Sequence, residues 1–301
     1  MKIPTRVFLS VTTLGLIFVI NTTAALASTA PGLGTAASYA VLAGTPNITN
    51  TGPTVISGSV GISPAALVTG FPPGTVTNGT IQAGTAPATT AKTDLTAAYG
   101  VAASSPCNFN RTGQNLGGLT LTPGTYCQTT APTLTGTLTL SGNGVFIFQI
   151  GSTLVTAPAA SVVLTNGAQA CNVYWQVSSS ATLDTTTAFV GTIMALTSIQ
   201  LNNGASIQGR ALARNGAVTL INNVITVPTT CNATTVVGPT ATAAPTVVAT
   251  PTPAVAGAPN GGGGPAQGQG FPWIIAIVGA MLGSAGVVSI GLSRRSDRRS
   301  R

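Results

Sequence analysis

The sequence predicts a mainly β protein, a β-solenoid with one α-helix packed beside it. Between residues 31 and 230, short segments of alternating or β-branched apolar residues are separated by Gly, Asn and Thr, which is the pattern of short strands between turns. Some segments recur: residues 148–152 resemble 175–179, and the stretch from Gly191 resembles the stretch from Gly209, an offset of 18 to 19 residues. Short strands that recur about every 20 residues are typical of solenoid coils.

The first 27 residues have the pattern of a secretory signal peptide. Lys2 and Arg6 precede an apolar run over residues 7–20, and Ala25 and Ala27 are small residues at the −3 and −1 positions of a cleavage site. The alternative is an uncleaved anchor, but the run is short for a span of about 20 residues. We expect the mature chain to begin near Ser28.

Residues 87–104 interrupt the strand pattern and predict an α-helix. This segment is rich in Ala, and Pro87 suits the first turn of a helix. One face is expected to pack on the solenoid, because its apolar residues follow i, i+3, i+4, i+7 spacing: Leu95, Ala98, Tyr99 and Ala102. We interpret these residues as core and not as a binding site.

The C-terminal part predicts a stalk and a membrane anchor. Residues 232–270 are dominated by Thr, Pro, Ala, Val and Gly, a composition that favours an extended linker. Residues 271–292 are apolar and uncharged, as in a transmembrane helix, and the five arginines of residues 293–301 indicate a cytoplasmic tail. The prediction is a single-pass protein of the cell membrane, with residues 28–231 as an extracellular domain.

The charges exclude two functional classes. The net charge of +8 comes mainly from the two ends, because only four basic residues, Lys92, Arg111, Arg210 and Arg214, lie between residues 28 and 231. A basic patch for nucleic acid is therefore not expected. The same segment contains two acidic residues, Asp94 and Asp184, and the chain has no His, so a polysaccharide lyase or hydrolase would lack its paired carboxylates. We predict neither an enzyme nor a cofactor.

Four cysteines in an exported chain predict disulfides. Three pairings are possible, and the favoured one joins Cys107 to Cys127 across a short loop and Cys171 to Cys231 before the linker. The cysteine spacing fits no zinc motif, so no metal site is predicted.

Several segments together carry a family resemblance that extends from residue 33 to about 228. In order along the chain they are LGTAASYAVLAGTPNITNTGPTVISGSVGISP, TGFPPGT, AKTDLTAAYGVAA, LGGLTLTPGTYC, GVFIFQIGSTL and GTIMALTSIQLNNGASIQGRALARNGAVTL. They resemble the microbial ice-binding protein family. The resemblance implies a right-handed, three-sided, discontinuous β-solenoid whose N-terminal segment forms a coil beside the C-terminal coils, with a long helix along one side. It also implies binding to an ice crystal surface through one flat face. We expect the protein to be a monomer.

Stacked solenoid strands place equivalent outward residues in a ladder about 4.7 to 4.9 Å apart, and small hydroxyl and methyl groups on such a ladder can order water that merges with ice. Aligning the recurring segments predicts one column on or beside the ice face: Ser152, Ser179, Thr197 and Asn215. Two alternatives stay open. These four could be ordinary turn residues, or the face could contain a second set, Thr182, Thr185, Thr187 and Ser206. The competing function is a surface adhesin that binds glycans or other cells.

Overall fold

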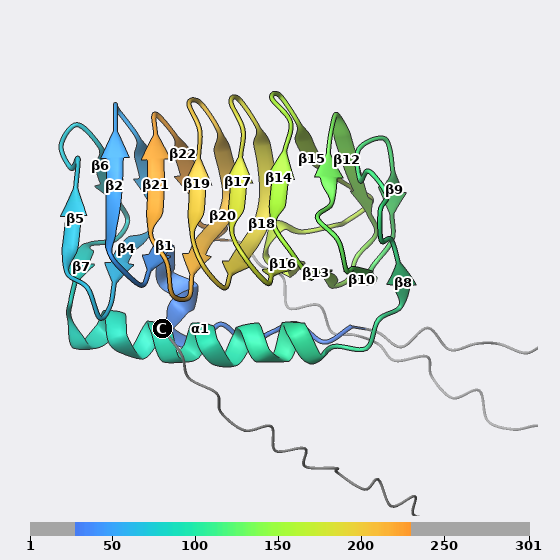
Figure 1. Cartoon of the computed structure of the whole chain (residues 1–301), viewed down its shortest axis with the longest axis horizontal. Coiled ribbons are helices and arrows are strands. Elements are labelled where there is room, and N and C mark those ends of the chain that lie inside the picture. The colour runs from blue at the N-terminus through green and yellow to red at the C-terminus, as the bar shows by residue number, and fades with distance from the viewer. Residues whose placement is uncertain (1–27, 230–301) are drawn as a thin grey trace, which may run out of the picture. The chain divides into compact units, whose positions relative to one another are not determined.

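The computed structural model describes residues 28–229, which form a stack of parallel strands with one long helix beside it (Figure 1). Four predicted segments lie outside the described residues: the signal peptide (1–27), the linker (232–270), the transmembrane helix (271–292) and the tail (293–301). Within residues 28–229, no helix is long and apolar enough to span a bilayer.

The stack has three sides, and the first is a separate sheet that we call the seven-stranded face. Its strands are all parallel and in register. In spatial order they are β11 (Thr133–Leu134), β14 (Leu154–Thr156), β17 (Ala181–Leu183), β19 (Ile199–Leu201), β21 (Val218–Ile221), β2 (Asn47–Thr51) and β5 (Leu67–Thr69).

The other two sides form one sheet, because two long strands bend around the corner between them. These are β18 (Ala188–Ala195) and β20 (Ser206–Ala213), which pair along their whole length. Their bends coincide at Gly191 and Gly209, whose φ angles are +110° and +154°. A Cβ on Gly209 would lie 1.9 Å from the carbonyl oxygen of Gly191, so the two coils can approach only with glycine here.

The first halves of β18 and β20 belong to what we call the third face. It also contains β9 (Thr120–Leu121), β12 (Thr137–Ser141), β15 (Ser161–Thr165), β22 (Val224–Thr226), β3 (Val55–Ser57) and β6 (Thr75–Thr77). The second halves belong to the helix face, with β8 (Phe109–Asn110), β10 (Gly124–Gln128), β13 (Phe146–Ile150), β16 (Val173–Val177), β1 (Tyr39–Ala43), β4 (Ser59–Ile62) and β7 (Ile81–Ala83). There are also two short 3₁₀ helices, η1 (Gly34–Ser38) and η2 (Ala170–Asn172).

The coils are not stacked in chain order. The early strand β2 pairs with the late strand β21, and β1 pairs with β20, so residues 39–83 extend the end of the stack that residues 206–226 form. The chain must then return to the opposite end, where β8 begins. The helix α1 (Ala86–Ser104, 19 residues) makes this connection along the solenoid (Figure 1). At 1.5 Å per residue it is about 28 Å long, close to six strand spacings.

The helix agrees with the sequence prediction in both position and orientation. It starts at Ala86, one residue before the predicted start, and ends at Ser104 as predicted, with Pro87 in its first turn. The four predicted face residues, Leu95, Ala98, Tyr99 and Ala102, are buried. They pack with outward side chains of the helix face in a second apolar cluster, which includes Tyr39, Leu42, Ile147, Tyr174, Met194 and Leu212. The helix therefore covers this face and leaves the other two faces of the solenoid open.

Aromatic rings form a row along the solenoid, from the buried Phe189 to the partly exposed Phe109 at the β8 end. The ring centroids of Phe148 and Trp175 are 3.9 Å apart, and those of Trp175 and Phe189 are 4.8 Å apart. Tyr126 and Phe109 continue the stack toward β8 at spacings of 5.3 and 5.0 Å. Trp175 is fully buried, and its indole N–H donates to the carbonyl oxygen of Val190 at 3.0 Å, so its polar atom is satisfied.

The predicted disulfide between Cys107 and Cys127 is present, with a Cα–Cα distance of 5.9 Å. It joins the segment after α1 to β10, near the end of the stack where β8 begins. Cys171 is also disulfide-bonded. Its predicted partner, Cys231, lies outside the described residues, so that pairing stays a prediction.

Candidate functional site

The seven-stranded face carries a continuous column of outward side chains. The register places one outward residue of each strand beside its counterparts in the neighbouring coils, and the residues that flank it in the chain point toward the core. In spatial order this central column is Thr133, Val155, Thr182, Gln200, Thr219, Thr49 and Thr69.

Threonine dominates the central column, and three threonines are consecutive at the β5 end: Thr219, Thr49 and Thr69. The hydroxyls of Thr49 and Thr219 are 3.5 Å apart, at the limit of a hydrogen bond. A threonine on a strand is stiff at χ1, so each position holds one hydroxyl and one methyl in a fixed orientation. The column is thus a rigid, uncharged series of alternating polar and apolar groups at the spacing of the strands.

A second column lies beside the first on the same surface. Its members are two positions earlier in the chain and therefore share the outward side: Thr153, Ser180, Ser198, Ala217, Asn47 and Leu67. Ser180 stiffens this flanking column. Its hydroxyl shares a 2.6 Å hydrogen bond with the hydroxyl of Thr197 and accepts one from the backbone N–H of Ser198 at 3.3 Å. Neither column contains an aromatic or charged residue.

The column predicted from the sequence lies along one edge of this face. Ser152, Ser179, Thr197 and Asn215 occupy bends at the corner between the helix face and the seven-stranded face. Backbone hydrogen bonds join adjacent coils there, from Thr197 N to Ser179 O and from Gly216 N to Thr197 O, each at 3.1 Å. The structure thus brings the four residues together in successive coils. That they contact ice stays a prediction.

The alternative set from the sequence does not form one column. Thr182 belongs to the central column, whereas Ser206 lies on the third face, where it pairs with Ala188 and Val224. Thr185 and Thr187 lie in the turn between these two faces. Thr187 is fully buried and shares a 2.8 Å hydrogen bond with Thr156, so it cannot contact a surface.

Sequence reasoning did not find most of the central column. It missed Thr133, Thr219, Thr49 and Thr69 because their strands have only two to five residues, which is too short for a convincing alternation. A usable signal exists in three coils: a threonine between two inward residues, as in Ile48-Thr49-Asn50, Ala181-Thr182-Leu183 and Val218-Thr219-Leu220.

The third face also has small outward residues, but its ladder is less regular. Its first column is Thr137, Ser161, Ala188, Ser206, Val224, Val55 and Thr75. Between β15 and β18 the strands are held by a single residue pair, Ser161 with Ala188. On the seven-stranded face, every neighbouring pair of strands shares at least two residue pairs.

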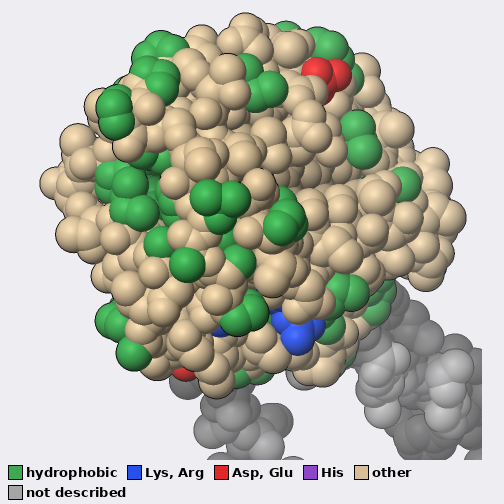
Figure 2. Space-filling view, turned by 60° about the vertical axis from the view of Figure 1, so that its left-hand side comes forward, with side chains coloured by type: hydrophobic (Ala, Val, Ile, Leu, Met, Phe, Trp, Pro, Cys, Tyr) green, Lys and Arg blue, Asp and Glu red, His purple; other side chains and the backbone are tan. Residues whose placement is uncertain are grey.

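Charged groups are few and lie outside both columns, and Figure 2 shows a surface with few charged side chains. Asp184 lies at the corner after β17, where its carboxylate accepts from Asn202 at 3.0 Å and from the backbone of Thr185 at 2.7 Å. These hydrogen bonds lower the pKa of Asp184. Asp94 on α1 accepts from Thr35, which lowers the pKa of Asp94 too. Among residues 28–229, no group of His, Cys, Asp and Glu could hold a metal ion.

The two arginines near the end of β20, Arg210 and Arg214, make different contacts. The buried Arg210 donates from Nε to the carbonyl oxygen of Ala37 at 2.9 Å and from Nη1 to the hydroxyl of Thr192 at 3.3 Å. Arg214 instead lies over the ring of Tyr99, with 4.6 Å between the guanidinium carbon and the ring centroid. The bend that follows β20 directs Arg214 toward the helix and not along the stack.

The chain is similar to known ice-binding proteins in its sequence. The Ice-binding-like family matches residues 41–226, more than half of the chain. An ice-binding protein of Nostoc sp. (strain HG1) is 50% identical over 208 residues, which cover 67% of this chain and 76% of that protein.

Solved structures agree with this result. The crystal structure of an ice-binding protein from an Antarctic biological consortium superposes with a TM-score of 0.64 at 46% identity, covering 70% of this chain and 96% of that one. That of the Antarctic ascomycete Antarctomyces psychrotrophicus superposes with a TM-score of 0.64 at 37% identity, covering 67% of this chain and 100% of that one. The chain therefore belongs to the ice-binding-like family.

Proposed function

We propose that this protein binds ice through the seven-stranded face and acts at the cell surface, where it attaches the cell to ice or suppresses recrystallisation. The observation that carries the proposal is the central column, in which five threonines, one valine and one glutamine repeat in register across seven parallel strands. Fixed hydroxyls can hydrogen-bond water at a regular spacing, and the adjacent methyl groups exclude disordered water between them. A charged group would hold its own hydration shell and break this order.

The competing function, glycan or cell adhesion on the same scaffold, finds less support on this face. Protein sites for neutral sugars commonly use exposed aromatic rings, and the two columns have none. The large aromatic side chains of the solenoid, such as Tyr126, Phe148 and Trp175, are buried in the core. A flat surface rich in hydroxyl and methyl groups matches an extended solid better than a single sugar unit.

The proposed location rests on the sequence of the C-terminal part. The apolar residues 271–292, followed by five arginines, suit a membrane anchor with a cytoplasmic flank. The preceding linker of residues 232–270, rich in Thr, Pro and Gly, would hold the solenoid away from the bilayer. In this arrangement the protein acts on ice next to the cell and not as a free antifreeze.

The activity can be measured directly on residues 28–231, prepared with the disulfides oxidised. We expect faceted ice crystals, measurable thermal hysteresis, inhibition of recrystallisation, and incorporation of the protein into a slowly growing ice hemisphere. A non-binding protein of similar size, treated in the same way, provides the baseline. If the domain stays in the liquid fraction and leaves crystal shape unchanged, ice binding is wrong and the adhesin function takes its place.

The tether requires a separate measurement. The full chain and a chain that ends at Gly270 are expressed in the same host, and the membranes are washed with alkaline carbonate. We expect the full chain in the washed membranes and the shortened chain in the medium, because residues 271–292 would supply the anchor. Cells with the full chain should also adhere to ice. Recovery of both chains in the medium would refute the membrane anchor and would leave the ice-binding proposal unaffected.

A further inference from the structure

A cleft at the side of the solenoid brings two positive charges together. It lies where α1 passes the junction between the N-terminal and C-terminal coils, and it has a volume of about 570 Å³. Lys92 enters it from the helix, and Arg214 enters it from the bend after β20. The remaining lining is uncharged: Gly44, Thr45, Ser63, Pro64, Thr89, Thr93, Thr96 and Asn215.

The local contacts hold both cations in place. The ammonium group of Lys92 donates to the backbone carbonyl oxygen of Ala213 at 2.6 Å and to that of Arg214. The guanidinium of Arg214 lies over the ring of Tyr99, and its Nε is buried without a hydrogen-bond partner. A guanidinium stacked on a ring keeps its N–H edge available for an acceptor. The site is therefore organised, but its hydrogen-bonding capacity is not used up.

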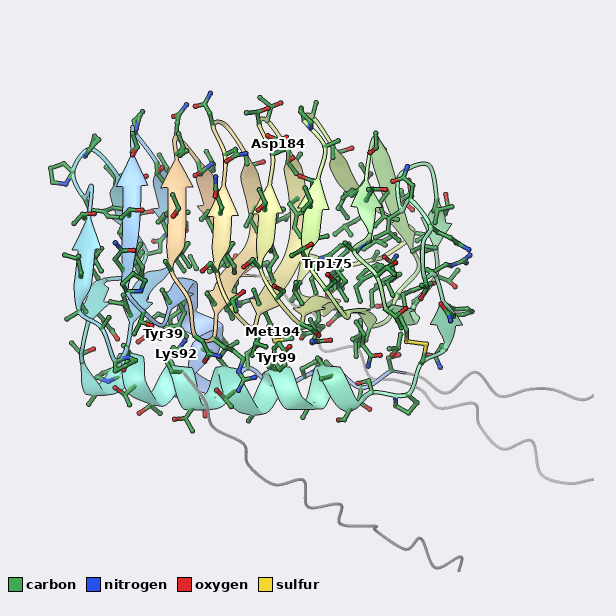
Figure 3. The ribbon with its side chains drawn as sticks, in the orientation of Figure 1. Tyr39, Lys92, Tyr99, Trp175, Asp184 and Met194 are labelled. Atoms are coloured by element: carbon green, nitrogen blue, oxygen red, sulfur yellow. A yellow bond between two sulfur atoms is a disulfide. The ribbon has the colours of Figure 1, made fainter. Side chains whose placement is uncertain are left out.

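Within residues 28–229, no carboxylate balances these charges. Of the two acidic residues in the described part of the chain, Asp94 is bound to Thr35 and Asp184 to Thr185 and Asn202. Asp184 also lies at the corner of the stack away from the helix that carries Lys92 (Figure 3). Burial and the nearby Arg214 lower the pKa of Lys92 to about 8, because both disfavour the charged form of its side chain.

The hydroxyls of the lining are engaged elsewhere. Those of Thr93 and Thr96 donate to helix carbonyl oxygens, and those of Ser63 and Thr89 share a 2.8 Å hydrogen bond. Besides the side-chain amide of Asn215, the side-chain donors left for a ligand are the charged groups of Lys92 and Arg214, which favours an acceptor that carries negative charge.

We propose that this cleft binds a small oxyanion, a carboxylate or a phosphate group, between the ammonium of Lys92 and the guanidinium of Arg214. This function goes beyond ice binding, since it uses neither the central nor the flanking column of the seven-stranded face; of the four edge residues predicted from the sequence, only Asn215 lines the cleft. The cleft is large enough to accept the oxyanion on its own or as part of a sugar acid.

The test is isothermal titration calorimetry on the full chain in detergent micelles, with three probes. Inorganic phosphate and galacturonate carry the oxyanion, and galactose is the neutral match of galacturonate. We expect saturable one-site binding of at least one anion and none of galactose. Tighter binding of galacturonate would identify a carboxylated sugar as the source, and tighter binding of phosphate would identify free phosphate. If neither anion binds, or galactose binds as well as galacturonate, the proposal is wrong.

Two variants locate the site. Arg214→Gln should weaken anion binding at least tenfold, whereas the matched control Arg111→Gln removes the same charge from a loop outside the cleft and should leave binding unchanged. Thr96→Glu places a carboxylate at the exposed helix position of the cleft and should abolish binding without disturbing the core. Equal affinity in Arg214→Gln and Arg111→Gln, or full affinity in a folded Thr96→Glu, would overturn the assignment.

Discussion

Replacing Thr219 with Tyr is expected to weaken ice binding about tenfold or more while leaving the fold intact. Thr219 lies in the central column between Gln200 and Thr49, so a ring at this position would stand above its neighbours and keep ice from the adjacent strands. A loss of about 1.4 kcal/mol in binding free energy suffices for a tenfold change. Stability should change by only about 0.5 kcal/mol, because the side chain points outward. Thermal hysteresis and a thermal melt measure the two effects.

Two matched variants separate the surfaces. Ser206→Tyr makes a comparable change on the third face, and Thr197→Tyr makes it in the edge column predicted from the sequence. If the seven-stranded face binds ice, Ser206→Tyr should behave like the parent protein, and Thr197→Tyr should have an effect no larger than that of Thr219→Tyr. If Thr219→Tyr keeps full ice-binding activity and Ser206→Tyr loses it, the third face and not the seven-stranded face binds ice.

The sequence predicted the scaffold better than the site, and particular residues show why. The helix could be predicted because Leu95, Ala98, Tyr99 and Ala102 repeat with a period that only a helix satisfies, and the segment is long enough to show it. The order of the coils came from the family resemblance and could not follow from periodicity. Pairing of Thr49 with Thr219 joins residues that are far apart in the chain, and no local pattern encodes it.

The site depends on a register that the sequence encodes weakly. The aligned segments correctly placed Ser179 and Thr197 in neighbouring coils. The alignment could not show that these residues lie in bends, three positions before the outward residues Thr182 and Gln200. The offset between paired residues also changes at a corner, from 18 for Met194 and Leu212 to 19 for Ile199 and Val218, so a column cannot be followed around a corner by counting. The faces become visible only when the strand pairs are known.

Replacing Trp175 with Ala is expected to cost about 3–5 kcal/mol of folding free energy, the range for removing a large buried aromatic residue. Trp175 is fully buried between Phe148 and Phe189, so its loss would leave a cavity inside the stack and remove the hydrogen bond to the carbonyl oxygen of Val190. Urea denaturation of the oxidised domain measures the change.

Val155→Ala is the matched control for this substitution. It also removes an apolar side chain, but from the central column, where Val155 is 45% exposed, so stability should change by no more than about 0.5 kcal/mol. The two variants thus compare the loss of stability at a core position with that at an exposed position of the central column. Trp175→Ala should lower the melting temperature yet retain ice affinity while folded, because it alters no surface group. If it unfolds no more easily than Val155→Ala, the aromatic stack does not hold the coils together, and the rigidity of the seven-stranded face must come from its strand pairing.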